Sequence, residues 1–382
     1  MKRITCFLTS ILMFLLIPAV AFAKEAQEEL PVEIKAKSAV LMDCNSGKVL
    51  LKYNEHEKLP PASVTKVMPL LLIVEAIDEG KISLSDTVTT SADAAAKGGS
   101  QIWLKEGEKM SVADLLKAVA VASANDACAA LGEFLAGSEK EFVRQMNERA
   151  KQLGMNDTVF YNCSGLDDED TNITSAYDIA LMSCELMKHD LIQDFSTIWM
   201  DSLRGGATEL VNTNKLVRFY PGTTGLKTGT TSKAGCCLSA TALRDGLHLC
   251  AVVMGSDNSS DRFESAKSML NYGFSSFVSV SPSVDRSLIT PVKVIMGEKS
   301  KIDPEIPEIK PLTVKKGDEK NLKQTVTLDL SATAPVEKGQ TVGKIVFSVG
   351  DEVLCEYSLA SPENVAAITL PFAFKKLLEK LT

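Results

Sequence analysis

Ser63 and Lys66 are the first residues in the chain whose types and spacing could carry out chemistry. They stand three positions apart in "LPPASVTKVM", residues 59–68, where an apolar run begins. A serine hydroxyl is a weak nucleophile until a neighbouring base removes its proton. A lysine one helical turn away lies on the same helix face and can be that base when neutral. The alternative is structural, because serine after two prolines is also a favoured start for an ordinary helix.

Two further segments contain residues that suit the same chemistry. "VASAND" places Ser123 and Asn125 at the junction of two expected helices, and "GLKTGTT" places Lys227, Thr228 and Gly229 on an expected strand. Each has an ordinary interpretation when taken singly, since Ser and Asn are common at helix breaks. K-T-G can likewise be a plain strand that ends in a turn. On an edge strand, however, it leaves backbone N–H groups free for a ligand.

The order of the three segments says more than any one of them. S-x-x-K opening a helix, S-x-N between helices and K-T-G on a late strand are together typical of class A β-lactamases and penicillin-binding proteins. The chain offers no G-x-S-x-G setting for a Ser-His-Asp arrangement. The sequence therefore indicates a serine nucleophile with a lysine base.

The elements expected around these residues form one α/β unit of roughly 250 residues, a size that a single domain can have. Residues 38–54 are two apolar runs around Asn45-Ser46-Gly47, which predicts a β-hairpin. A serine followed three residues later by an acidic residue marks three helix starts, at Ser111, Ser138 and Ser175. From Gly225 the pattern predicts three strands, the last two joined at Arg244-Asp245-Gly246, and a closing helix over 261–274.

Past about residue 280 the composition changes. Short alternating runs between Gly and Pro predict a small all-β domain over 279–360, after a catalytic domain over 24–278. In the tail, residues 361–382, four apolar residues at helical spacing stand beside three lysines: Phe374, Leu377, Leu378 and Leu381, with Lys375, Lys376 and Lys380. This amphipathic helix is too short to span a bilayer, so it either lies on a membrane or packs on the β domain.

The first 23 residues have the features of an export signal. A cationic start is followed by an apolar stretch and by Ala21-Phe22-Ala23, a small-x-small cleavage site. The alternative is an uncleaved anchor, since the run is nearly long enough to span a membrane. In either case we expect an exported protein at the outer face of the bacterial cytoplasmic membrane or in the cell wall.

Composition limits the partners and cofactors. The formal net charge of −8 and the lack of a basic stripe argue against nucleic acid. The three histidines lack metal-ligand spacing and no C-x-x-C occurs, so we expect neither a metal nor another cofactor. Eight cysteines follow the leader, mostly in apolar stretches, and are expected to be small core residues. Their disulfide status stays open.

At these motifs the chain resembles the exported D-alanyl-D-alanine carboxypeptidases, the low-molecular-mass penicillin-binding proteins. The resemblance spans nearly the whole chain and is carried by "LPPASVTKVM", "SANDACAALGE", "NTNKLV" and "GLKTGTTSKAGCCLSATA". It implies an antiparallel sheet with helices, followed by a small all-β domain and an amphipathic C-terminal helix. It also implies the substrate, the D-Ala-D-Ala end of peptidoglycan stem peptides, and penicillins as acylating inhibitors.

The resemblance assigns roles to the motif residues. Ser63 would form the acyl-enzyme, Lys66 would accept its proton, and Ser123 would relay a proton to the leaving D-alanine. Asn125 would bond the substrate amide. The remaining residues belong to one strand: Lys227 and Thr228 would hold the terminal carboxylate, Gly229 completes the K-T-G motif, and the N–H of Thr230 would form the oxyanion hole with that of Ser63.

The chain also departs from the family pattern. Asn162-Cys163-Ser164-Gly165-Leu166 stands where relatives commonly have Asn-Pro-His-Gly-Leu, and a second usual histidine is replaced near Asn172. Pro69 lies in the nucleophile helix and is expected to kink it. Four alternatives therefore accompany the carboxypeptidase: a β-lactamase, an endopeptidase, a transpeptidase, and a catalytically idle wall-binding protein.

Overall fold

The structure is a computed structural model that describes residues 30–167 and 170–379. The expected export signal, residues 1–23, lies outside the described residues. Within 30–167 and 170–379, no helix has the length and apolar character needed to cross a membrane.

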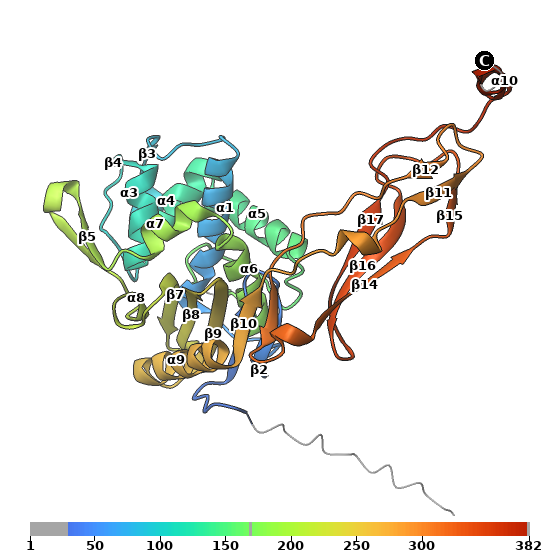
Figure 1. The fold of residues 1–382 in the computed structure, drawn as a ribbon. Coiled ribbons are helices and arrows are strands. Elements are labelled where there is room, and N and C mark those ends of the chain that lie inside the picture. Colours follow the sequence, from blue (N-terminus) through green and yellow to red (C-terminus); the bar gives the residue numbers. More distant parts are fainter. Residues whose placement is uncertain (1–29, 168–169, 380–382) are drawn as a thin grey trace, which may run out of the picture. The chain divides into compact units, whose positions relative to one another are not determined.

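A five-stranded antiparallel sheet forms the centre of the N-terminal two thirds of the chain (Figure 1). Its strand order is β2 (Val49–Tyr53), β1 (Ser38–Asp43), β9 (Leu247–Ser256), β8 (Gly235–Arg244) and β7 (Thr223–Thr231). The predicted hairpin and the three late strands are therefore confirmed. The K-T-G segment lies on a strand, β7, as expected, and this strand is at the edge of the sheet.

The two faces of this sheet are covered by different helices (Figure 1). Successive residues of a strand point to opposite faces, and in β9 every residue is buried. Leu249, Ala251 and Val253 pack in one apolar cluster with α9 (Ser259–Ser276). The residues between them belong to a second, larger cluster, which includes α1 (Val67–Asp78) and α6 (Ala176–Leu186).

The helical region supplies most of the second cluster. It comprises α2 (Ala92–Ala95), α3 (Val112–Lys117), α4 (Asn125–Ala136), α5 (Glu139–Gln152), α7 (Gln193–Ser196) and α8 (Leu216–Phe219), with the short hairpins β3 (Thr87–Thr89)–β4 (Lys109–Ser111) and β5 (Met200–Leu203)–β6 (Thr208–Val211). The three predicted N-caps are confirmed. The hydroxyls of Ser111, Ser138 and Ser175 each accept the backbone N–H three residues later.

Ser63, in contrast, caps no helix. It lies inside a 3₁₀ turn, Ala62–Lys66, and the α-helix begins only at Val67. The residue before the turn is Pro61, and no side chain caps it. Pro69, which was expected to kink the nucleophile helix, lies in the first turn of α1, where a missing N–H costs no helical hydrogen bond.

The C-terminal part is all-β until its last helix, as predicted. Its strands are β10 (Phe277–Val280), β11 (Val292–Ile295), β12 (Lys301–Ile302), β13 (Leu312–Lys315), β14 (Leu322–Leu328), β15 (Ser331–Thr333), β16 (Thr341–Val349) and β17 (Glu352–Ala360). After β17 the chain still belongs to the β structure, because Val365 is buried and bridges Val336. The tail helix α10 spans Leu370–Glu379.

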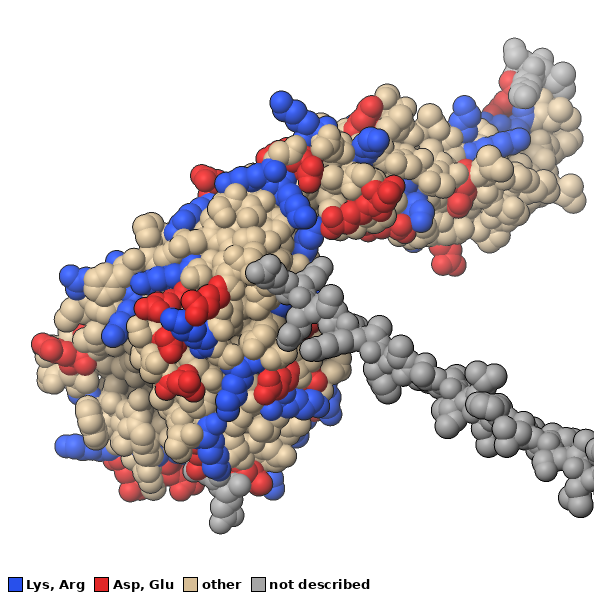
Figure 2. Space-filling model, turned by 90° about the horizontal axis from the view of Figure 1, so that it is seen from below, with Lys and Arg blue, Asp and Glu red and all other residues tan. Residues whose placement is uncertain are grey.

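The charged surface is mixed. On the face that Figure 2 presents, Lys and Arg side chains alternate with Asp and Glu side chains over the described residues.

Candidate active site

Ser63 and Lys66 are in direct contact. The Nζ atom of Lys66 lies 3.0 Å from the Oγ of Ser63 and donates a second hydrogen bond, 2.6 Å long, to the carbonyl oxygen of Ser164. The Lys66 side chain is fully buried, and this burial lowers its pKa to about 8. A lysine with that pKa supplies a neutral amine within hydrogen-bond reach of the nucleophile.

The backbone around Ser63 is tightly constrained. Ala62, just before it, has a φ of +48°, a left-handed conformation that non-glycine residues rarely adopt. Gly165 packs so closely on this turn that a Cβ there would lie 1.9 Å from the carbonyl oxygen of Ala62. Strain of this kind gathers at functional sites, where the surroundings hold it in place.

Ser123 and Asn125 follow a π-helical turn, Ala118–Ala122, between α3 and α4. Ser123 itself has a φ of +64°. Among the described residues, the Oγ of Ser123 and the Oδ1 of Asn125 are buried atoms without a hydrogen-bond partner. The Asn125 Nδ2 donates to the carbonyl of Gly98 at 2.6 Å, which fixes the amide so that its oxygen stays available. Buried polar atoms are normally paired, so both atoms are candidates for contact with a ligand.

Lys227, Thr228 and Gly229 lie on the edge strand β7. Lys227 is fully buried, and its pKa is lowered well below the ordinary lysine value by desolvation, then by the charges of Lys66 and Arg262. The Oγ1 of Thr228 donates to the hydroxyl of Thr213 at 2.7 Å. Burial beside two other cations therefore disfavours the charged form of Lys227 in the ligand-free protein.

The "NTNKLV" segment joins the S-x-N and K-T-G motifs. The backbone N–H of Thr213 donates to the carbonyl of Val121, in the π-helical turn, at 3.2 Å. Its hydroxyl accepts from Thr228 on β7. Thr213 thus connects the segment that carries Ser123 to the strand that carries Lys227.

Arg262, near the start of α9, is a site-supporting residue that the sequence analysis missed. Its Nη1 atom donates to the carbonyl of Gly229 and to the Oγ1 of Thr230, both at 2.9 Å, and to the carbonyl of Cys237 at 3.2 Å. These hydrogen bonds hold Gly229 and Thr230 in place from the side of the sheet that α9 covers. In the sequence it is one arginine among many polar helix residues, with no spacing that would single it out.

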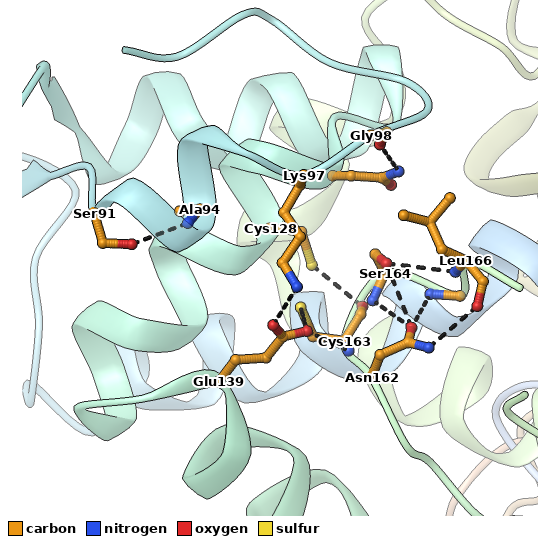
Figure 3. Close-up of polar contacts among 12 residues, drawn as sticks. Ser91, Ala94, Lys97, Gly98, Cys128, Glu139, Asn162, Cys163, Ser164 and Leu166 are labelled. Atoms are coloured by element: carbon orange, nitrogen blue, oxygen red, sulfur yellow. Dashed lines mark hydrogen bonds and ion pairs between the residues drawn. The ribbon is translucent and has the colours of Figure 1, made fainter. Parts of the chain in front are cut away.

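The loop that departs from the family pattern holds the second acceptor of Lys66 in place (Figure 3). The Oδ1 of Asn162 accepts from the backbone N–H of Ser164 and Gly165, at 3.2 and 2.7 Å, and its Nδ2 donates to the carbonyl of Leu166. Asn172 donates to the hydroxyl of Thr65 and to the carbonyl of Asn162. Residues 162–166 therefore form a hydrogen-bonded turn that presents the Ser164 carbonyl to Lys66.

A family model described as D-alanyl-D-alanine carboxypeptidase matches residues 23–258, and one described as penicillin-binding protein 5, C-terminal domain, matches residues 279–367. The chain belongs to the D-alanyl-D-alanine carboxypeptidase family. It is accordingly a serine-type peptidase, a hydrolase that acts on peptidoglycan, and the resemblance seen in its motifs is confirmed.

Individual relatives extend the match to both domains. The chain is 41% identical to the D-alanyl-D-alanine carboxypeptidase DacF of Bacillus subtilis, over 96% of this chain and 95% of that protein. It is 36% identical to DacC of Escherichia coli, over 93% and 90%. Among solved structures, penicillin-binding protein 5 from Haemophilus influenzae superposes with a TM-score of 0.80 at 30% identity, covering 88% of this chain and 99% of that one.

Proposed function

We propose that Ser63 is the nucleophile that removes the terminal D-alanine from peptidoglycan stem peptides, and that penicillins acylate the same hydroxyl. The observation that carries the proposal is the contact between the Lys66 Nζ and the Ser63 Oγ at 3.0 Å, with a buried lysine of lowered pKa. A hydroxyl and a neutral amine at that distance are an activated nucleophile and its base.

The acylation step follows from the placement of these groups. Lys66 takes the Ser63 proton as the Oγ attacks the carbonyl carbon of the penultimate D-alanine. Ser123, whose hydroxyl has no partner in the described structure, relays the proton from Lys66 to the departing nitrogen, and the C–N bond breaks. Water then attacks the ester on Ser63, which releases the shortened peptide and restores the free hydroxyl.

The other motif residues would bind rather than react. The free Oδ1 of Asn125 accepts a substrate N–H, and Lys227 with Thr228 holds the terminal carboxylate. The N–H groups of Ser63 and Thr230 stabilise the oxyanion. Gly229 lets β7 approach the nucleophile turn, because a Cβ at this position would lie 2.7 Å from the carbonyl oxygen of Pro61.

The same site chemistry leaves three neighbouring activities as competitors. A β-lactamase would hydrolyse its acyl-enzyme rapidly, but the chain carries a C-terminal domain that the lactamase class usually lacks, and the matching relatives are named as carboxypeptidases. A D,D-endopeptidase or transpeptidase would use the same acyl-enzyme with a cross-linked peptide or an amine acceptor.

We also propose that the chain is exported, and that α10 holds it at the outer face of the membrane. The helix has no buried residue, and its apolar side chains Leu370 and Phe374 are 89% and 65% exposed. Lys375 and Lys376 stand beside them in the sequence, as in amphipathic helices that bind at a membrane interface. The boundaries 24–278 and 279–360 remain predictions.

Labelling with a fluorescent penicillin, followed by mass spectrometry of the adduct, tests the central proposal. We expect one stable adduct on Ser63 and release of D-alanine from a stem pentapeptide. Neither should occur with Ser63→Ala, because no acyl-enzyme can form. An adduct on another residue would refute the assignment, absence of any adduct would favour an idle wall-binding protein, and rapid loss of the adduct with hydrolysed penicillin would favour a β-lactamase.

A further inference from the structure

Two cysteines lie together beside the candidate active site. Cys128 is on α4, three residues after Asn125, and Cys163 precedes Ser164 in the hydrogen-bonded turn (Figure 3). The Sγ of Cys128 donates to the carbonyl of Cys163 at 3.4 Å. Both side chains are buried, with 1% and 0% of their surface exposed.

The environment makes the two thiols unequal. The interaction with Cys163 lowers the pKa of Cys128, and the positive charges of Lys66 and Lys227 lower it further against the effect of burial. The interaction with Cys128 and burial raise the pKa of Cys163, whose thiol donates to Glu139 at 3.2 Å. A pair of this kind ionises first at Cys128, and the thiolate is the form that attacks a disulfide.

We propose that Cys128 and Cys163 are an oxidisable pair, and that a disulfide between them slows acylation of Ser63. The second half of this statement rests on the proposed function. The oxidant is a small-molecule disulfide. The Cys128 thiolate attacks one of its sulfurs and releases a thiolate; the Cys163 thiolate then attacks the Cys128 sulfur of the mixed disulfide and releases the other. Two electrons and two thiol protons pass to the oxidant, which leaves as two thiols.

The link to catalysis is the residue that follows Cys163. The carbonyl of Ser164 accepts the 2.6 Å hydrogen bond from Lys66, and Lys66 contacts Ser63. A covalent bond is shorter than any contact between unbonded sulfurs, so oxidation draws residue 163 toward α4. It also takes the Cys163 thiol away from Glu139, which is paired with Lys97 (Figure 3). The hydrogen bond between Lys66 and Ser63 is therefore seen in the structure in which both thiols are reduced.

A second thiol contact provides an internal control. The Sγ of Cys184, on α6, lies 3.0 Å from the Sγ of Cys44, which follows β1. Neither element supplies a residue of the proposed site. Oxidation of this pair should leave the contacts of Lys66 in place.

The experiment compares the purified chain after incubation with dithiothreitol and after incubation with 2-hydroxyethyl disulfide. Peptide mapping without reduction should identify a 128–163 cross-link in the oxidised sample. Its rate of acylation by a fluorescent penicillin should fall about tenfold or more, since misplacement of a catalytic group by about 1 Å can cost this much. Dithiothreitol should restore the rate.

Variants assign the effect to this pair. In Cys163→Ala and in Cys128→Ala the ratio of the acylation rate after oxidation to the rate after reduction should be about one. The control variant Cys184→Ala should keep the full decrease in rate. Either of the first two variants alone is enough to assign the effect to this pair. The proposal is overturned if no 128–163 cross-link forms, if the cross-linked protein acylates at the reduced rate, or if Cys163→Ala keeps the effect. Failure of the reduced protein to label at Ser63 would instead overturn the proposed function, while the peptide map would still decide on the cross-link.

Discussion

Gly229 lies against the backbone of Ser63. A Cβ added to Gly229 would stand 2.9 Å from the backbone nitrogen of Ser63, and equally close to that of Val64. Real Cβ atoms do not approach backbone that closely. The glycine of K-T-G is therefore required because the edge strand and the nucleophile turn are in contact at this point.

Gly229→Ala should separate the strand from the nucleophile turn. We expect acylation by penicillin to slow about 100-fold, because a displacement of about 1 Å at the reacting groups has that effect. The free energy of unfolding should fall by only about 1–3 kcal/mol, the usual cost of overpacking. Stopped-flow labelling and denaturant unfolding measure the two quantities. An acylation rate within threefold of the parent would show that the close approach is not needed.

The two lysines of the site should respond differently to arginine. Lys66→Arg should slow acylation about 1,000-fold or more, because arginine cannot release a proton at working pH and general-base catalysis is removed. Lys227→Arg keeps a cation for the carboxylate, so it should weaken substrate capture and retain measurable acylation. Both variants are measured with penicillin after their folding is confirmed by circular dichroism. Faster acylation by Lys66→Arg than by Lys227→Arg would contradict the base assignment.

Lys66→Met should stabilise the protein at neutral pH. Lowering a lysine pKa from 10.5 to about 8 corresponds to about 3 kcal/mol of cost for the charged form in the folded state. The cost is fully present below pH 8, where folded and unfolded chains both carry the proton, and it disappears as pH rises toward 10.5. Loss of the Lys66 hydrogen bonds offsets part of the gain, so we expect about 1–2 kcal/mol at pH 7.

Urea unfolding of Lys66→Met at pH 7 and pH 10 checks this expectation. The gain should shrink or reverse at pH 10. The exposed Lys109 provides the control, since Lys109→Met should change the stability by less than about 0.5 kcal/mol at either pH. If the increase in the free energy of unfolding of Lys66→Met became larger as the pH rises, the result would contradict a buried lysine with a lowered pKa.

Truncation after Thr369 should release the protein from membranes. The cut removes α10 but keeps Val365, which is buried in the β structure. We expect signal-processed protein to move from the membrane fraction to the medium, with unchanged activity on soluble peptides. Fractionation and a D-alanine release assay report both. An unchanged membrane fraction after truncation would favour an N-terminal anchor or a helix that packs on the β domain.

The sequence predicted those parts of the site that depend on local patterns. Ser63, Lys66 and the helix caps at Ser111 and Ser138 are visible because each role requires particular residue types at a fixed spacing. Ser63 was wrongly expected to cap a helix, since nothing local distinguishes a 3₁₀ turn that aims a hydroxyl at Lys66 from an ordinary first turn.

The remaining parts depend on contacts between distant segments. Arg262 supports Gly229 only because α9 packs on the back of the sheet, and Asn162 matters only because its turn reaches the 3₁₀ turn Ala62–Lys66. The sequence could show that the 162–166 loop departs from its relatives. It could not show that the backbone carbonyl of Ser164 in this loop accepts a hydrogen bond from Lys66.

The depressed pKa of Lys227 has a consequence for how ligands bind. A carboxylate bound beside a lysine raises the pKa of that lysine, which opposes the lowering that burial and the charge of Lys66 cause at Lys227. If a peptide terminus binds at Lys227, as proposed, its capture favours proton uptake by this lysine. The heat of binding should depend on the ionisation enthalpy of the buffer, and the affinity for the peptide terminus should fall as the pH rises. A bound carboxylate would thereby favour the charged form of Lys227 in the pocket where the substrate reacts.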